Sequence, residues 1–400
     1  MVADIAKPPT ADKSRENRLL LCCARNHIDS IRAEQIKTLL HENLDWDYLL
    51  QTAFSHKVTP LLYCSLNSTC PEAVPQARLA QLRDYFHSNA RRNLFLTGEL
   101  LKILNLFSTH RIPAIAFKGP VLAASVYGQL VLRQFCDLDI MICEQDTIKT
   151  KKLLSSQGYQ LGLQLNWQYH FVHKDSRVNL DIHYAGLTPR ERPLSLHFQH
   201  LWSRVKPVSV SGTPVLTFQP EDLLLILCVQ VAKDCWQWRE QLAKICDVAE
   251  AIRVHPKIDW HQVIQQARST GSERMLFLGL LLAHELLGTS LPDQVWQRMQ
   301  AHPIVNILCQ QVCERLFTME QSATAHRLPK YRDTEKNLFY FRVRERLRDK
   351  VPYFLYLAKA LLSPTVEDYE SLPLPASLYF LYYLTRPFRL ARKCRLFQQG

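Results

Sequence analysis

The stretch from Ala114 to Ile142 constrains this chain more than any other. It reads AIAFKGPVLAASVYGQLVLRQFCDLDIMI, in which a short apolar run ends at Lys118-Gly119-Pro120 and a second apolar run contains Asp137-Leu138-Asp139. Short apolar runs beside turn residues are typical of buried strands, and proline is tolerated in the first turn of a helix. The stretch therefore predicts strands over residues 114–117 and 137–142, with a turn and a helix over residues 120–127 between them.

Two carboxylates share one face of the second predicted strand. Side chains two residues apart in a strand point the same way, so Asp137 and Asp139 project together while Leu138 and Ile140 enter the core. Like charges this close repel strongly unless a cation lies between them, and Mg²⁺ or Mn²⁺ prefers carboxylate ligands. The pair therefore indicates a divalent metal site. The alternative is the end of a strand that faces solvent, because Asp-x-Asp also occurs by chance.

A third carboxylate sharpens this interpretation. Apolar and polar residues alternate in the segment VNLDIHY, so Asp181 faces the same side as Asn179 and His183. If this strand pairs beside the strand of Asp137, three carboxylates converge. Such a triad can hold two metal ions, and it suits in-line phosphoryl or nucleotidyl transfer.

Several cationic and glycine residues near these carboxylates are candidates for binding phosphate. Lys118 offers a point charge, and Gly119 lets the backbone approach closely. Arg133 can hold another phosphate oxygen through two hydrogen bonds. We expect His183 either to contact nucleotide or acceptor or to make a structural hydrogen bond, and Asp247 either to cap its helix or to pair with a basic residue near the site.

A pair of histidines on the preceding strand offers a different metal site. His170 and His173 lie three residues apart, so on a strand they point to opposite faces. We therefore expect both rings to pack in an aromatic-rich hairpin rather than to share a metal.

The motifs of the core match a known family pattern. The matching residues are Phe117-Lys118-Gly119, Leu122, Tyr127-Gly128, Arg133, Asp137-Leu138-Asp139 and Leu180-Asp181-Ile182-His183-Tyr184. In these residues the chain resembles the uncharacterised bacterial nucleotidyltransferase family (NTP_transf_5) of the DNA polymerase β-like nucleotidyltransferase superfamily. The likeness covers residues from Phe117 to the end and is strongest over 117–184. It implies an α+β fold, in which a small mixed β-sheet forms a nucleotidyltransferase core embedded in a largely helical chain.

The chain is expected to have four regions. Residues 1–15 form a disordered N-terminus, 16–110 an N-terminal helical region, 111–219 the nucleotidyltransferase-like α/β core, and 220–400 a C-terminal helical domain. Within the core, strands are expected at 159–163, 167–173 and 177–184, with a hairpin of 205–210 and 214–218. Only 11 glycines occur, which favours long helices over a loop-rich all-β fold.

Charge and cysteine usage restrict the partners and the compartment. The formal net charge of +12 suits a polyanionic partner, although a basic solvated surface explains it equally well. The 12 cysteines are irregularly spaced and form no Cys-x-x-Cys pair, which argues against structural zinc and against a disulfide framework. No apolar run reaches the ~20 residues of a spanning helix. We expect a soluble protein in a reducing cytoplasm.

Two basic runs near the C-terminus have two interpretations. They contain Arg342, Arg344, Arg346, Arg348 and Lys350, and then Arg386, Arg389, Arg392, Lys393 and Arg395. A solvated face is the preferred interpretation. Contact of the C-terminal basic helix with a membrane surface or a phosphorylated acceptor is the alternative.

These features lead to one principal hypothesis. A metal-dependent nucleotidyltransferase would move an NMP group, for example AMP from ATP, to the hydroxyl of an unidentified small molecule, sugar, peptide, protein or RNA. Asp137 and Asp139 would bind Mg²⁺ or Mn²⁺, Asp181 would complete the catalytic site, and Lys118, Gly119 and Arg133 would hold the NTP phosphates. One rival is a glycosyltransferase whose Asp-x-Asp binds the metal of a nucleotide sugar without needing Asp181. The other is a non-catalytic nucleotide-binding or interaction protein.

Overall fold

The computed structural model of the chain describes residues 14–165, 167–184, 201–236, 241–317 and 334–363, and a few positions between 372 and 386. Contacts divide the chain into two units, Met1–Glu320 and Gln321–Gly400. Residues 1–13 of the expected disordered N-terminus lie outside the described residues, and the region boundaries expected near 110 and 219 fall inside the first unit. Among the helices described, none has the length and apolar character needed to cross a membrane.

Helices occupy the chain up to residue 110, as the apolar spacing predicts. They are α1 (Ser14–Cys23), α2 (Ser30–Leu40), α3 (Trp46–Ser55), α4 (Thr59–Thr69), the short η1 (Pro71–Ala73) and α5 (Gln76–Thr109). The carboxylates of Asp29 and Asp45 cap α2 and α3 by accepting hydrogen bonds from backbone N–H groups of the first turn. The long α5 presents Leu100 and Phe107 to the sheet that follows.

A five-stranded mixed sheet follows, in the order β1-β2-β5-β4-β3. Its strands are β1 (Ala114–Ala116), β2 (Asp137–Ile142), β3 (Tyr159–Gln164), β4 (Gln168–His173) and β5 (Asn179–His183). Only the β2–β5 pair within this sheet is parallel. The small mixed sheet and the adjacency of β2 and β5 are therefore confirmed.

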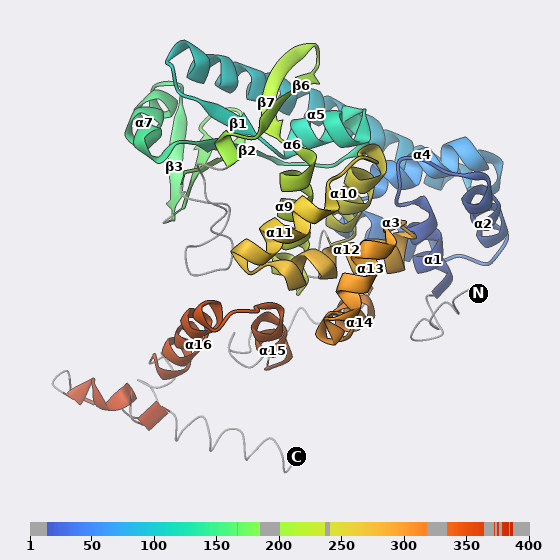
Figure 1. Cartoon of the computed structure of the whole chain (residues 1–400). Helices are drawn as coiled ribbons and strands as arrows, with labels where there is room; N and C mark the ends of the chain where they lie inside the picture. The colour runs from blue at the N-terminus through green and yellow to red at the C-terminus, as the bar shows by residue number, and fades with distance from the viewer. Residues whose placement is uncertain are drawn as a thin grey trace. The chain divides into compact units, whose positions relative to one another are not determined.

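One face of this sheet forms the hydrophobic core. Leu138, Ile140, Leu180 and Ile182 are all fully buried on it, against α5 and against α7 (Thr147–Ser156). The hairpin of β6 (Val205–Val210) and β7 (Thr213–Phe218) adds further apolar side chains to the same core. Figure 1 shows α7 beside β3 at the outer edge of the sheet, and the β6–β7 hairpin rising next to β1. Alternation of residue type along the strands is therefore a correct guide to which side chains enter the core.

The segment between β1 and β2 differs in detail from the single helix predicted over 120–127. An α-helical turn, α6 (Gly119–Leu122), passes directly into a π-helical turn, η2 (Ala123–Tyr127), which ends at left-handed Gly128 (φ 72°). A 3₁₀ turn, η3 (Leu130–Leu132), then leads to β2. After β2, the 3₁₀ turn η4 (Glu144–Asp146) leads directly into α7. Single π turns inside helices occur frequently at functional sites.

Six further helices complete the first unit over the described residues, in the region that was predicted to be helical. They are α9 (Pro220–Asp234), α10 (Gln241–Val254), α11 (Trp260–Thr270), α12 (Glu273–Leu287), α13 (Asp293–Gln300) and α14 (Pro303–Leu316). Most residues of α9 and α12 are buried, and the two helices pack against each other.

The contact between α9 and α12 depends on Gly279. A Cβ atom at position 279 would lie 2.7–2.8 Å from atoms of Cys228, which is closer than such atoms approach. We expect Gly279→Ala to push the helices apart and to lower the free energy of unfolding by about 1–3 kcal/mol. The control is Gly98→Ala on α5, because no atom lies within 4 Å of a Cβ atom placed at Gly98. We expect this change to stabilise the chain by about 0.5–1 kcal/mol. Urea unfolding checks both, and a harmless Gly279→Ala would contradict the close contact.

The second unit contains α15 (Thr334–Val343) and α16 (Leu347–Leu362). Two arginines of the expected solvated face are buried here, which corrects that prediction for them. Arg344 is 3% exposed, donates to the carbonyl of Tyr340 and lies over the ring of Tyr353, and Arg386 is fully buried. Arg389, Arg392, Lys393 and Arg395 lie outside the described residues.

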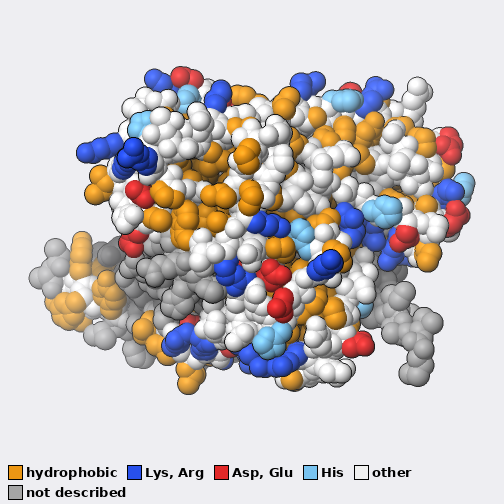
Figure 2. Space-filling model, turned by 45° about the horizontal axis from the view of Figure 1, so that its top comes forward, with side chains coloured by type: hydrophobic (Ala, Val, Ile, Leu, Met, Phe, Trp, Pro, Cys, Tyr) orange, Lys and Arg blue, Asp and Glu red, His pale blue; other side chains and the backbone are white. Residues whose placement is uncertain are grey.

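The net positive charge is not concentrated on the face drawn in Figure 2. Lys and Arg side chains are scattered there singly and in small groups, with hydrophobic and uncharged side chains between them. A continuous basic stripe that could follow a nucleic-acid backbone is absent from the described part of this face.

Candidate functional site

The second face of the sheet carries the three predicted carboxylates. Asp137 and Asp139 lie two residues apart on β2, and in the parallel register Asp139 is the direct partner of Asp181 on β5. Asp139 is buried at 4% exposure, whereas Asp137 and Asp181 are half-buried. The structure therefore brings the carboxylates predicted from sequence to one face of neighbouring strands.

Lys118 and Gly119 lie directly against these carboxylates. The Nζ atom of Lys118 is 2.9 Å from Oδ1 of Asp139, and both side chains are largely buried. Gly119 adopts a left-handed conformation with φ 49°, and a Cβ atom there would lie 3.2 Å from the carbonyl oxygen of Asp137. The turn therefore requires glycine in order to bring Lys118 onto the acidic strand.

Burial and neighbouring charges shift the pKa values of the site residues, and the two effects oppose each other at Asp139 and Lys118. Burial alone would raise the pKa of Asp139, but the charges of Lys118 and His183 and their hydrogen bonds lower it well below its usual range. Burial likewise disfavours the Lys118 ammonium, but Asp139, Asp137 and Asp181 raise its pKa. Burial and the charge of Asp139 raise the pKa of Asp137. Asp139 is thus held ionised, while the charge of Asp137 is disfavoured until a further cation approaches.

His183 supports Asp139 from inside the protein. Its Nε2 atom is 3.1 Å from Oδ1 of Asp139, its ring meets that of Phe117 edge-on at 5.3 Å, and it is 4% exposed. Of the two expectations for His183, the structure shows the structural hydrogen bond. A direct contact between His183 and nucleotide stays a prediction.

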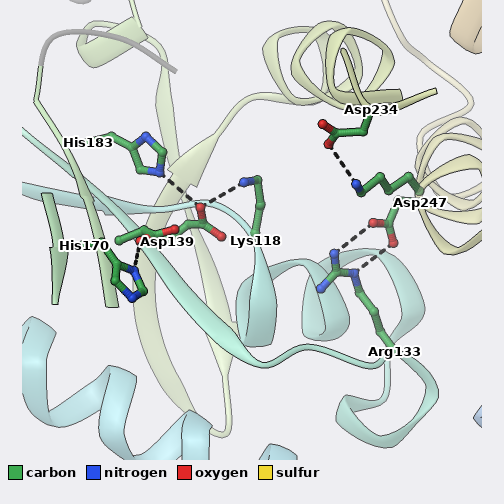
Figure 3. Close-up of polar contacts among 9 residues, drawn as sticks. Lys118, Arg133, Asp139, His170, His183, Asp234 and Asp247 are labelled. Carbon is green, nitrogen blue, oxygen red and sulfur yellow. Dashed lines mark hydrogen bonds and ion pairs between the residues drawn. The ribbon is translucent and has the colours of Figure 1, made fainter. Parts of the chain in front are cut away.

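His170 is a site residue that sequence reasoning missed. It lies opposite Asp181 in the antiparallel β4–β5 register, and its Nδ1 atom is 2.7 Å from Oδ1 of Asp181. Figure 3 shows His170 and His183 on the same side of the sheet as Asp139. His173 instead meets the ring of Tyr159 edge-on at 4.9 Å, so the aromatic packing expected for both histidines is found for His173, whereas His170 pairs with Asp181. The predicted strands 167–173 and 177–184, paired evenly about their turn, set His170 opposite Leu180, whereas the observed register is shifted by one residue and sets it opposite Asp181.

Arg133 lies in a separate cluster. Its Nε and Nη2 atoms each bind one oxygen of Asp247 on α10 at 2.9 Å, and the hydroxyl of Tyr127 donates to the same carboxylate at 2.8 Å. Figure 3 shows this pair apart from the group around Asp139. The expected pairing of Asp247 with a basic residue is confirmed. The predicted contact of Arg133 with phosphate stays a prediction, and the guanidinium already donates two hydrogen bonds to Asp247.

The carboxylate face suits a divalent cation that a nucleotide brings with it. Among the described residues, no group of three His, Cys, Asp or Glu is arranged to enclose a metal ion. However, Mg²⁺ is commonly held by one or two carboxylates together with substrate phosphates, and Asp137 and Asp139 supply two. The charges of Asp139, Asp137 and Asp181 all act on the ammonium of Lys118, so the site is rich in negative charge. These donors fit Mg²⁺ or Mn²⁺ as partners of a bound NTP.

Comparison with models of protein families assigns the chain to a family. A model of the family described as "Uncharacterised nucleotidyltransferase" matches residues 42–288, which is more than half of the chain. The chain belongs to this family. It is thus a nucleotidyltransferase, and the match begins in the helices before the core, earlier than the Phe117 expected from motifs alone.

Solved structures with similar folds also include nucleotidyltransferases. The solution structure of the antibiotic-resistance factor ANT(2'')-Ia is 12% identical and covers 44% of this chain and 91% of its own, with a TM-score of 0.33. The lincosamide antibiotic adenylyltransferase LnuA is 22% identical over 32% of this chain and 83% of its own, with a TM-score of 0.26. An antigenic nucleotidyltransferase-like protein from Paracoccidioides brasiliensis is 13% identical over 51% and 96%, with a TM-score of 0.33. Scores this low identify no substrate for this nucleotidyltransferase, and no curated protein matches it.

Proposed function

We propose that this nucleotidyltransferase transfers an NMP group from an NTP to an acceptor hydroxyl, with Mg²⁺ or Mn²⁺ held at Asp137 and Asp139. The observation that carries the proposal is the parallel β2–β5 register, which sets Asp139 beside Asp181 on the face that Lys118 reaches. ATP is the first NTP to test. The family match supports nucleotidyl transfer over the glycosyltransferase alternative.

Each side chain has a distinct role in this proposal. Lys118 has three N–H donors, so it can keep its bond to Asp139 while donating to a phosphate oxygen. Asp181 orients the acceptor hydroxyl and takes its proton. The acceptor oxygen then forms a bond to the α-phosphorus as the bond to pyrophosphate breaks in line. When bound, the divalent ion neutralises phosphate charge and favours ionisation of the attacking hydroxyl.

His170 and His183 are positioning residues in this scheme. Each binds one carboxylate of the site through a single ring nitrogen, His183 on Asp139 and His170 on Asp181. A carboxylate fixed by a neighbour presents its other oxygen in a defined direction, which favours a preorganised site.

The acceptor and the compartment are also proposals. We propose a cytoplasmic enzyme, because every cysteine that the structure describes is free of a disulfide bond. The acceptor class remains a small molecule, sugar, peptide, protein or RNA.

Labelled nucleotides test the proposal. The purified chain is incubated with Mg²⁺ or Mn²⁺, a cell extract and each NTP labelled either at the α- or at the γ-phosphate. We expect an extract component to acquire the α-label, while the γ-label leaves in pyrophosphate. Transfer of the γ-label would instead show phosphoryl transfer, and binding of NTP with no transfer would favour the non-catalytic alternative.

A further inference from the structure

A lysine, Lys57, occupies the left-handed position that follows helix α3, where glycine is usual. The N–H of Val58 donates to the carbonyl of Ala53 at 3.0 Å, and the N–H of Lys57 donates to the carbonyl of Phe54 at 3.1 Å. This pair of bonds is a Schellman motif, in which the left-handed residue is usually glycine. Lys57 occupies that position with φ 57°, a conformation that costs free energy for any residue with a Cβ atom.

The side chain of Lys57 extends to the start of β2. Its Nζ atom is 3.6 Å from Sγ of Cys136, the residue immediately before Asp137. The positive charge of Lys57 acts on the carboxylate of Asp137 from this position. Lys57 therefore adds a second ammonium to the acidic end of β2, although it comes from the helical region before the core.

The backbone that carries Lys57 is fixed on both sides. The carbonyl of the preceding residue, His56, accepts a hydrogen bond of 3.2 Å from the N–H of Ala243 on α10. The ring of His56 is buried and meets Phe317 edge-on at 5.7 Å, and Val58 is fully buried. The turn thus holds the lysine at a defined place beside Asp137.

We propose that Lys57 binds the phosphate chain of the NTP as a second cation beside Lys118. This inference rests on the proposed function. Lys118 is already bonded to Asp139, so a highly charged triphosphate needs a further positive group, and Lys57 supplies it at the neighbouring carboxylate. Strained backbone at a functional residue is retained where the side chain is needed. The family match from residue 42 includes Lys57, so the family extends over this turn.

The ordinary alternative is that Lys57 only complements the dipole at the C-terminal end of α3. Lys57→Gly separates the two explanations, because glycine relieves the strain and removes the charge together. We expect Lys57→Gly to melt at the same or a higher temperature than the wild type. Its Kd for ATP in Mg²⁺ should rise about tenfold, with little change for AMP, which has a single phosphate. Lys57→Met, which keeps the stem and loses the charge, should weaken ATP binding similarly.

Arg111 provides a matched control. It is an exposed basic residue with φ 53° in the same kind of turn, in which it donates to Ser108 and its neighbour Ile112 donates to Phe107, each at 2.9 Å. Arg111→Gly should raise the melting temperature and leave the Kd for ATP unchanged.

Calorimetry on the full chain with Mg²⁺ and ATP distinguishes the outcomes. If the wild type binds ATP and both Lys57 variants bind within twofold of it, the role of Lys57 is overturned while the proposed function stands. A loss of AMP affinity equal to the loss of ATP affinity would also overturn it, since that result indicates a general distortion. If the wild type binds no NTP, the proposed function itself falls.

Discussion

Asp137→Asn is expected to lower nucleotidyl transfer by about 10³-fold, the scale on which loss of one preorganised electrostatic group reduces catalysis. The same change should leave the fold as stable as the wild type or more so. The reason is that burial and the charge of Asp139 raise the pKa of Asp137, so its ionised form is disfavoured in the folded chain. Activity should therefore fall without a loss of stability, which is expected of a residue that serves function rather than folding.

The measurement is pyrophosphate release together with thermal unfolding. Asp84→Asn is the control, because Asp84 is exposed on α5 and pairs only loosely with Arg83 at 3.8 Å. It should change neither activity nor melting temperature. Full activity in a double variant that carries both Asp137→Asn and Asp139→Asn would contradict a catalytic role for these two carboxylates.

Asp247→Asn is expected to destabilise the chain by about 3–5 kcal/mol, because it leaves a buried guanidinium without its counter-charge. The Asp247 side chain is 3% exposed, and it accepts two hydrogen bonds from Arg133 and one from Tyr127. Since both donors lie between β1 and β2, this carboxylate fixes the segment that leads from the Lys118 turn to the acidic strand.

Denaturant unfolding measures this cost, with Glu34→Gln as the control. Glu34 and Lys37 form an equally short pair of 2.9 Å on the exposed surface of α2, and its loss should change stability by less than about 1 kcal/mol. Adding Arg133→Met to Asp247→Asn should recover part of the loss, because the unpaired charge is then removed. Equal effects of Asp247→Asn and Glu34→Gln would show that the buried pair fixes nothing.

The sheet could be predicted from the sequence because apolar and polar residues alternate along its strands. Because side chains in a strand alternate between its two faces, Leu138 and Ile140 must lie on one face and Asp137 and Asp139 on the other. The alternation around Asp181 does the same for β5, so the convergence of the carboxylates needed only the pairing of the two strands, which the structure confirms. Local pattern thus predicted the acidic face, and the resemblance to the nucleotidyltransferase family implied the α+β class.

The remaining contacts depend on tertiary packing, which no local pattern encodes. Arg133 and Asp247 are 114 positions apart, and nothing in either segment specifies that they meet. Lys57 looks like an ordinary helix-end lysine until its left-handed backbone and its approach to Cys136 are seen. His170 was missed because it was compared with His173 along its own strand, and its partner Asp181 lies across the hairpin.

Helix α10 has a consequence for exchanging parts between members of this family. It holds the turn of Lys57 through the N–H of Ala243 and the segment of Arg133 through Asp247. A chimera that transplants only the sheet and its loops, residues 111–219, would leave out α10 and the turn of Lys57, and would therefore lose both of these contacts. The smallest transferable block therefore extends from α3 through α10, and interchangeable modules in this protein cannot be drawn at the edges of its sheet.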